Sequence, residues 1–83
     1  MRDEIHGIPV RIRCDGERCF VSDDALNLYG AGNTPEEARH DYWLAVQDYY
    51  ADLRANADRL APPLQEHLAL LRQVFAECWA NAS

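Results

Sequence analysis

The chain has 83 residues, and its 14 Asp and Glu residues outnumber eight Arg residues, which gives a formal net charge of −6 at pH 7. This length suits one small domain with a single modest core, so we expect one domain across residues 1–83. The acidic balance argues against direct binding to nucleic-acid phosphates and favours a basic partner. Three Cys residues, with no apolar leader and no apolar run of about 18 residues, predict a reduced, soluble, cytoplasmic protein.

The first third of the chain has the alternating pattern of half-buried strands. Apolar and charged side chains alternate over residues 10–15, and the Asp15-Gly16 pair then favours a hairpin turn. A second strand follows, continued on one face by Cys19 and Val21 or by Arg18 and Phe20, and the segment ALNLYG, residues 25–30, alternates again with Leu26 and Leu28 on one face. These three segments predict a three-stranded antiparallel meander.

The segment GNTPEEA then carries the signals of a helix start. Thr34 suits the N-cap, Pro35 suits the first helical position, and Thr34 with Glu37 forms the S/T-x-x-E pattern of a capping box. Glu36 and Glu37 also place negative charge in the first turn, where the helix dipole favours it. We therefore expect one continuous helix over residues 35–56.

Both predicted helices have an apolar face. At about 100° per residue, the first helix carries a broad apolar arc, which suits contact with a sheet and with a second helix. The arc consists of Ala38, Tyr42, Trp43, Ala45, Val46, Tyr49, Tyr50 and Leu53. The segment ADRLAPP interrupts this pattern, because proline lacks an amide proton and restricts the residue before it. A second helix then follows with a narrow apolar seam, formed by Leu64, Leu68, Leu71, Phe75 and Cys78. The predicted architecture is α+β, a two-layer βββαα domain.

These segments together resemble the HicB-like antitoxin family. The resemblance rests on the DG hairpin, the block LYGAGNTPEEA, a helix rich in Tyr and Ala, and the final DRLAPPLQEHLALLRQVF, and it covers nearly the whole chain. It implies a partial RNase H-like fold without that fold's catalytic set, which binds and neutralises a small basic mRNA-cleaving toxin of the HicA type. The segment SDDALNLYG lacks the Pro-Asp-Leu-Pro-Gly type of turn found in many members, and we expect no separate DNA-binding domain after Trp79.

An acidic stripe on the first predicted helix is consistent with a basic partner. At about 100° per residue, four carboxylates project within roughly 60° of one another. Such a stripe can steer a basic partner, although a solvated helix face that keeps the protein soluble has the same pattern. The candidate partner-binding residues are Glu37, Asp41, Asp48 and Asp52.

Other candidate sites have weaker support. Asp23-Asp24, with Asp15 and Glu17 on nearby strand ends, suggests a metal-binding cluster, but adjacent Asp residues are common turn formers. The Cys14-x4-Cys19 spacing is wrong for a usual zinc knuckle, and we expect Cys14 and Cys78 to pack as small apolar residues.

Catalytic and nucleic-acid sites also have little support. His40 and His67 lack a nucleophile at a recognisable spacing, so we expect no catalytic residues, cofactor or metal. Arg11, Arg13 and Arg18 on the outer face of the first hairpin could bind RNA or an acidic patch on another copy. With no aromatic interleaving beyond Phe20, solubility and edge protection are the favoured roles of these arginines.

Self-association is the last expectation. Four hydrophobic side chains lie at the edges of the helices' apolar arcs, and so small a core has difficulty covering them, which favours a homodimer. These are Trp43, Tyr50, Leu70 and Val74. Two functions therefore stay open: an antitoxin-type inhibitory module, or a stand-alone homo-oligomeric RNase H-like interaction domain with another protein or a small ligand as its partner.

Overall fold

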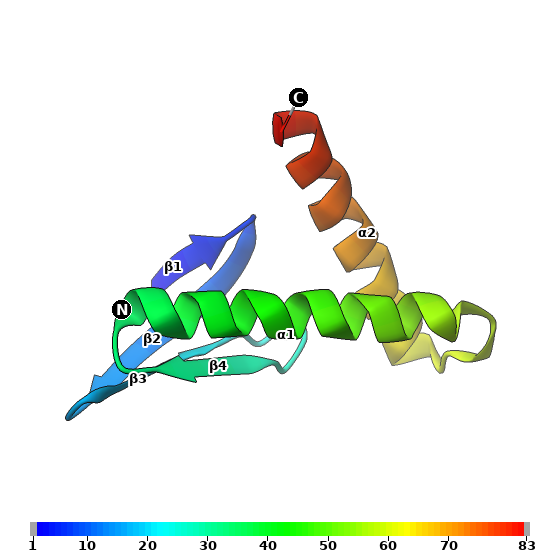
Figure 1. The fold of residues 1–83 in the computed structure, drawn as a ribbon. Helices are drawn as coiled ribbons and strands as arrows, with labels where there is room; N and C mark the ends of the chain where they lie inside the picture. Colours follow the sequence, from blue (N-terminus) through cyan, green and yellow to red (C-terminus); the bar gives the residue numbers. More distant parts are fainter. Residues whose placement is uncertain (1, 83) are drawn as a thin grey trace.

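The computed structural model describes residues 2–82, and it describes side chains for residues 2–76. A four-stranded antiparallel sheet is followed by two long helices joined by a short 3-10 turn, so the α+β class is confirmed (Figure 1). The elements are β1 (Arg2–Ile5), β2 (Ile8–Asp15), β3 (Arg18–Ser22), β4 (Tyr29–Gly32), α1 (Pro35–Ala55), η1 (Ala57–Arg59) and α2 (Pro62–Ala82).

The sheet contains a strand that the sequence pattern did not predict, so the three-stranded meander was wrong by one strand. The strands lie in the order β1-β2-β3-β4, and β1 pairs with β2 through a two-residue turn at His6 and Gly7. Both turn residues have positive φ, 50° and 86°, as a type I′ hairpin turn requires. Only Ile5 of β1 is buried, so this strand has no hydrophobic alternation by which it could have been found.

The hairpin predicted at Asp15-Gly16 forms between β2 and β3, and it is cross-linked. Asp15 pairs with Arg18, which places Gly16 and Glu17 in the turn. Cys14 pairs with Cys19 across the ladder, and a disulfide joins them. Cys14 is exposed, so its expected role as a small packed residue was wrong, and these two thiols are not reduced. Cys78 lies outside the described side chains.

The predicted third strand is in fact mostly a loop. Residues 23–28 form an irregular connection, and only Tyr29–Gly32 pairs with β3. The Asp23 carboxylate is buried and accepts hydrogen bonds from the amides of Leu26 at 2.5 Å and Leu28 at 2.9 Å. These bonds satisfy the backbone amides within the loop and place Leu26 in the core. Leu26 is therefore apolar because it is buried from a loop, although its pattern in the sequence was interpreted as that of a strand.

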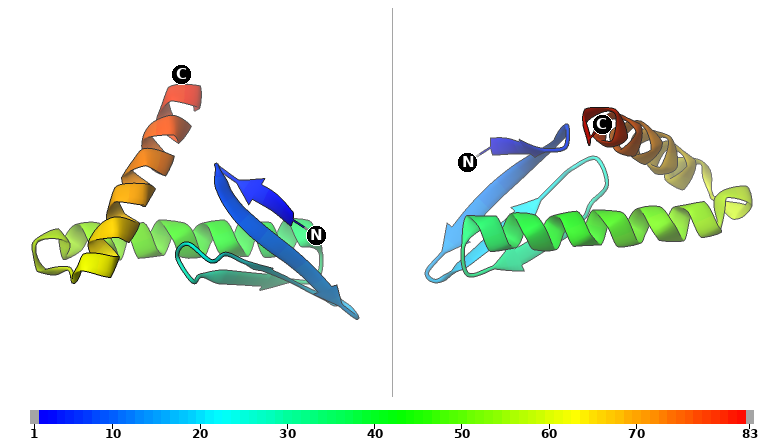
Figure 2. Two further views of the ribbon diagram at one scale, coloured as in Figure 1. Left: turned by 180° about the vertical axis from the view of Figure 1, so that it is seen from behind. Right: turned by 45° about the horizontal axis from the view of Figure 1, so that its top comes forward.

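Helix α1 begins where the capping block predicted. The Glu37 amide donates to Thr34 Oγ1 at 3.1 Å, and the Asn33 amide donates to Glu37 Oε2 at 2.8 Å, which completes the capping box. The helix lies along one face of the sheet, and no described element covers the other face (Figures 1 and 2). Gly30 makes the closest approach, because a Cβ built there would lie 2.2 Å from the Tyr42 amide nitrogen.

Helix α2 packs against the C-terminal half of α1 and then diverges from α1, on the side of the molecule where the β1–β2 turn lies (Figures 1 and 2). Among residues 62–76 of α2, the buried ones are Leu68, Leu71 and Val74, and Leu64 at the expected seam is 37% exposed. One continuous core joins the sheet and both helices. It consists of Ile5, Ile8, Val10, Ile12, Cys19, Val21, Leu26, Ala38, Tyr42, Val46, Leu53, Leu68, Leu71 and Val74.

Candidate partner-binding surface

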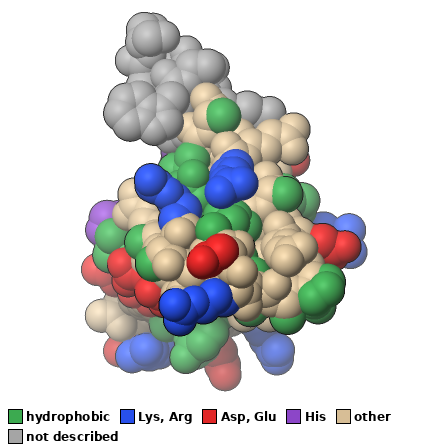
Figure 3. Space-filling view, turned by 90° about the vertical axis from the view of Figure 1, so that its right-hand side faces the viewer, with side chains coloured by type: hydrophobic (Ala, Val, Ile, Leu, Met, Phe, Trp, Pro, Cys, Tyr) green, Lys and Arg blue, Asp and Glu red, His purple; other side chains and the backbone are tan. Residues whose placement is uncertain are grey.

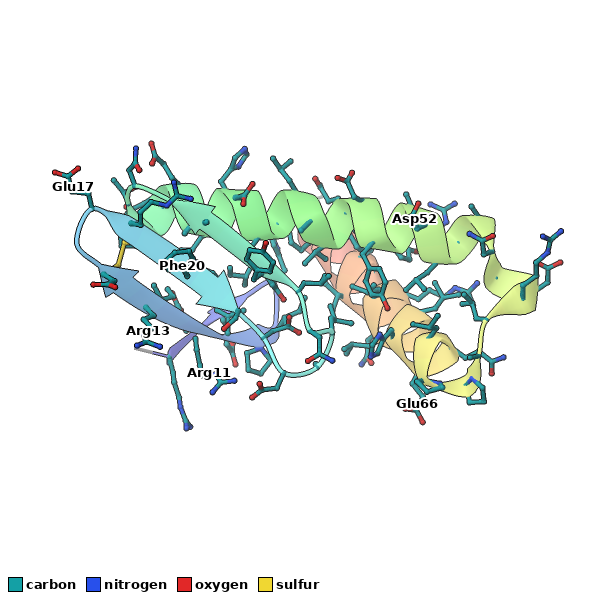
Figure 4. The ribbon with its side chains drawn as sticks, turned by 90° about the horizontal axis from the view of Figure 1, so that it is seen from below. Arg11, Arg13, Glu17, Phe20, Asp52 and Glu66 are labelled. Atoms are coloured by element: carbon teal, nitrogen blue, oxygen red, sulfur yellow. A yellow bond between two sulfur atoms is a disulfide. The ribbon has the colours of Figure 1, made fainter. Side chains whose placement is uncertain are left out.

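The four acidic residues predicted as a stripe are all exposed on α1, but they fall into two pairs with different surroundings. Glu37 and Asp41 lie over the end of the helix that covers β4. Asp48 and Asp52 lie in the C-terminal half, beyond the sheet; Figure 4 labels Asp52 there. The structure therefore brings the stripe together on one helix and assigns its two halves different contacts.

The first pair hydrogen-bonds the backbone of β4 and its following turn. Asp41 Oδ2 accepts from the Ala31 amide at 2.9 Å, and Glu37 Oε2 accepts from the Asn33 amide. In extended backbone, the amides of residues two apart point to the same side, and on a helix the side chains of residues four apart lie one turn apart on the same face. The amides of Ala31 and Asn33 therefore match the spacing of the carboxylates of Asp41 and Glu37. These carboxylates stabilise the contact between α1 and the sheet edge.

The opposite sheet edge is protected in a similar way. Asp3 Oδ1 accepts from the Glu4 amide at 2.7 Å, and the other carboxylate oxygen of Asp3 pairs with Arg39 of α1. Unpaired amides on an edge strand are a template for pairing with another chain, and side-chain carboxylates and charges remove that opportunity. Association with a partner is therefore expected through faces of the molecule, not through strand addition.

The second acidic pair is available to a partner. Asp48 and Asp52 make no ion pair with any residue in the described range 2–76. Leu44, 44% exposed, lies one turn before Asp48 on the same side of α1, so an apolar side chain adjoins the free carboxylates. A hydrophobic anchor beside charged groups is typical of protein interfaces. Sequence reasoning missed Leu44, although its position outside the apolar arc was the signal.

The four residues predicted as oligomer contacts are used mainly inside the chain. Val74 is buried in the core with 5% of its surface exposed, so its predicted place at the edge of the apolar arc was wrong. Leu70, Trp43 and Tyr50 are half-buried and pack against the core. Part of the surface of these three side chains stays exposed, and the homodimer remains a prediction.

An aromatic stack connects the β1–β2 turn to both helices. The ring centroid of Trp43 lies 4.0 Å from that of His6 and 5.3 Å from that of Phe75. Phe75 in turn stacks on Tyr50 at 4.4 Å, and the Arg54 guanidinium carbon lies 5.4 Å from the Tyr50 ring centre. These stacked rings bury, within one chain, much of the surface of Trp43 and Tyr50 that the sequence analysis assigned to contacts with a second copy.

A groove of about 740 Å³ lies beside this stack, between α1 and α2. Its lining includes Tyr50, Phe75, Arg54 and Arg72. Figure 3 shows positive and hydrophobic side chains next to one another at this end of the molecule. The groove thus differs in charge from the acidic face of α1.

The residues considered for metal binding or catalysis have structural contacts. Asp23 holds the 23–28 loop, and exposed Asp24 pairs with Arg11. Among the described residues, no group of three or more His, Cys, Asp or Glu side chains could hold a metal ion. Nδ1 of His67 lies 2.7 Å from the Tyr49 hydroxyl, a hydrogen bond that joins α2 to α1.

Tyr42 is the most strongly perturbed titratable group described. Its side chain is fully buried beneath β4, and its hydroxyl makes no hydrogen bond of ordinary geometry with a described residue. Burial first, and then the nearby Asp23 carboxylate, raise the pKa of Tyr42 well above its ordinary value of 10.0. A neutral tyrosine in the core with no solvent access is a packing residue, not an acid or base for a substrate.

Comparisons with protein-family models, curated proteins and solved structures find no match to this chain. Within the described residues, neither helix combines the length and the hydropathy needed to cross a bilayer.

Proposed function

We propose that this protein is a HicB-like antitoxin, which binds and neutralises a small basic mRNA-cleaving toxin of the HicA type and has no catalytic activity of its own. The observation that carries the proposal is the free half of the acidic face of α1. Asp48 and Asp52 are exposed and without an ion pair among residues 2–76, and exposed Leu44 adjoins them. An acidic face of this kind attracts a basic nuclease and competes with its RNA substrate for the same positive charges.

The sequence resemblance adds the identity of the partner. The GNTPEEA block forms the predicted capping box and turns the chain from β4 into α1, so the residues that carry the resemblance also position the acidic face. The finer fold assignment, a partial RNase H-like domain, rests on the same resemblance. Homodimer formation and cytoplasmic location also belong to this proposal, and the Cys14–Cys19 disulfide removes reduced thiols as support for that location.

The test uses the adjacent reading frame. If it encodes a basic protein of small size, that protein is expressed from an inducible promoter with and without this chain, and growth and mRNA integrity are followed. We expect growth arrest and mRNA cleavage that this chain relieves, together with a co-purified complex. If the product of the adjacent reading frame is toxic and this chain does not relieve its toxicity, the antitoxin function is contradicted. Metal-dependent RNA cleavage by the purified chain alone would contradict its non-catalytic nature.

A further inference from the structure

The face of the sheet opposite α1 is an uncovered surface with its own charge. Figure 4 views the molecule from this side, with Arg11, Arg13 and Phe20 labelled on the sheet. Cross-strand partners share a face, so Arg2 of β1, paired with Arg11, belongs to the same surface. A groove of about 740 Å³ runs here, lined by these three arginines and Phe20 together with Asp15, Ser22 and Ile12. Four of the chain's eight arginines, these three and Arg18, therefore lie on one sheet face although the chain as a whole is acidic.

Two of these arginines are free to bind an anion. Arg11 pairs with Asp24, and the Arg18 guanidinium carbon lies 6.0 Å from the Phe20 ring centre. Arg2 and Arg13 are exposed and make no ion pair with any described residue. The outer face also carries the carboxylates of Glu4 and Asp15, and Asp24 pairs with Arg11, so the two unpaired guanidinium groups stand among both charges on a chain whose net charge is −6.

Two exposed aromatic rings accompany the arginines. Phe20 of β3 is 38% exposed and Tyr29 of β4 is 70% exposed. Tyr29 pairs with Ser22, two residues along β3 from Phe20, so the two rings are diagonal neighbours with Cα atoms about 7–8 Å apart. Sequence reasoning assigned the first hairpin only one aromatic residue, because the pairing of Tyr29 and of Arg2 became apparent only from the strand order.

We propose that this open sheet face binds single-stranded nucleic acid, with bases stacked on Phe20 and Tyr29 and phosphates bound by Arg2 and Arg13. Exposed rings beside guanidinium groups on a flat face are the chemistry by which proteins bind unpaired strands. A second copy is a poor occupant, because a two-fold axis through this face would bring its arginines together. An acidic peptide would satisfy the arginines but gives no role to a tyrosine ring that is 70% exposed.

The experiment measures fluorescence anisotropy of a labelled mixed-sequence oligonucleotide of about 12 nucleotides, as RNA and as DNA, with the full chain at about 50 mM salt. We expect single strands to bind with a dissociation constant on the order of 10⁻⁵ M and a strong salt dependence. Tyr29→Ala should weaken binding about tenfold, whereas Tyr29→Phe, which keeps the ring, should bind as the wild type does. The double change Arg2→Gln and Arg13→Gln should lower the slope of log K against log salt by about 1.4.

A matched control separates this surface from general charge. Arg59→Gln with Arg72→Gln removes the same charge at the other end of the molecule and should leave binding unchanged. Three results would overturn the proposal: no binding of single strands at low salt, an equal loss in the control variant, or a duplex bound as tightly as a single strand. Binding of poly-glutamate without binding of oligonucleotides would identify an acidic protein partner instead.

Discussion

Asp41 on α1 accepts a hydrogen bond from the Ala31 amide of β4 at 2.9 Å, and this contact ties an acidic helix residue to the sheet edge. A residue that sequence analysis assigned to partner binding thus has a structural role. Asp41→Ala should lower the free energy of unfolding by about 1–2 kcal/mol, because it leaves the Ala31 amide without its acceptor and opens the edge. Denaturant melts measure the loss, and light scattering detects the association expected of an open edge.

Asp48→Ala is the matched control for Asp41→Ala, because Asp48 has the same chemistry on the same helix but is among neither the hydrogen-bonded nor the ion-paired carboxylates described. Its stability should stay within about 0.5 kcal/mol of the wild type. Equal stability of the two variants would mean that the Asp41 contact contributes nothing measurable to the fold.

Reversal of the free acidic pair tests the partner surface. Asp48→Arg with Asp52→Arg should slow association with the proposed basic toxin and reduce its dependence on salt, because the attraction is removed while both side chains face water. Stopped-flow association at several ionic strengths measures the rate, and thermal melts should be nearly unchanged.

The control for this reversal is Asp58→Arg with Glu66→Arg, which makes the same change in net charge on η1 and α2. Both control residues are exposed. An equal slowing in both variants would show that net charge, and not the face of α1, governs the encounter.

Gly30→Ala tests how closely α1 approaches the sheet. A Cβ there would lie 2.2 Å from the Tyr42 amide nitrogen and 2.6 Å from the Ala38 carbonyl oxygen, and both are backbone atoms that move only with the helix. The substitution should cost about 3 kcal/mol or more in denaturant melts. Gly16→Asn is the control, since Gly16 has φ +63° and no atom near the added Cβ, and it should cost less than about 1 kcal/mol.

Tyr42 should make the fold sensitive to alkali. In the unfolded chain this tyrosine ionises near its ordinary pKa of 10.0, whereas the raised pKa keeps it protonated in the fold. The unfolded state therefore releases a proton that the folded state retains, and stability falls above pH 10 by about 1.4 kcal/mol per pH unit. Tyr42→Phe should reduce this slope, with a remainder from Tyr49, whose pKa burial also raises, and Tyr29→Phe should leave the slope unchanged. Urea melts over that pH range measure the slope, and an equal slope in the Tyr42→Phe variant would contradict the assignment.

Local signals in the sequence predicted most of the helical half. Thr34, Pro35 and Glu37 defined the start of α1, and the apolar arc of that helix correctly included Tyr42 and Val46, both now buried. These predictions succeeded because caps and helical periodicity depend on residues within one or two turns of each other.

The rest depended on tertiary contacts. Strand β1 was missed because it has one buried residue and is held by pairing with β2, and Leu26 was misassigned because a buried Asp23 side chain replaces a strand partner in its loop. The sequence of α1 also could not show that Glu37 and Asp41 bond to the backbone of β4 and its following turn whereas Asp48 and Asp52 stay free. Whether a helix carboxylate is free or bonded depends on where β4 lies beneath it.

The stack of His6, Trp43 and Phe75 links residues from the β1–β2 turn, the middle of the chain and the last helix. Contacts between such distant positions close long loops, so we expect them to form after the local contacts within helix α1. Trp43 lies between the two ends and is covered by both. Loss of either end would expose its indole ring, so the first and last parts of the chain depend on each other for their stability although they lie at opposite ends of the sequence.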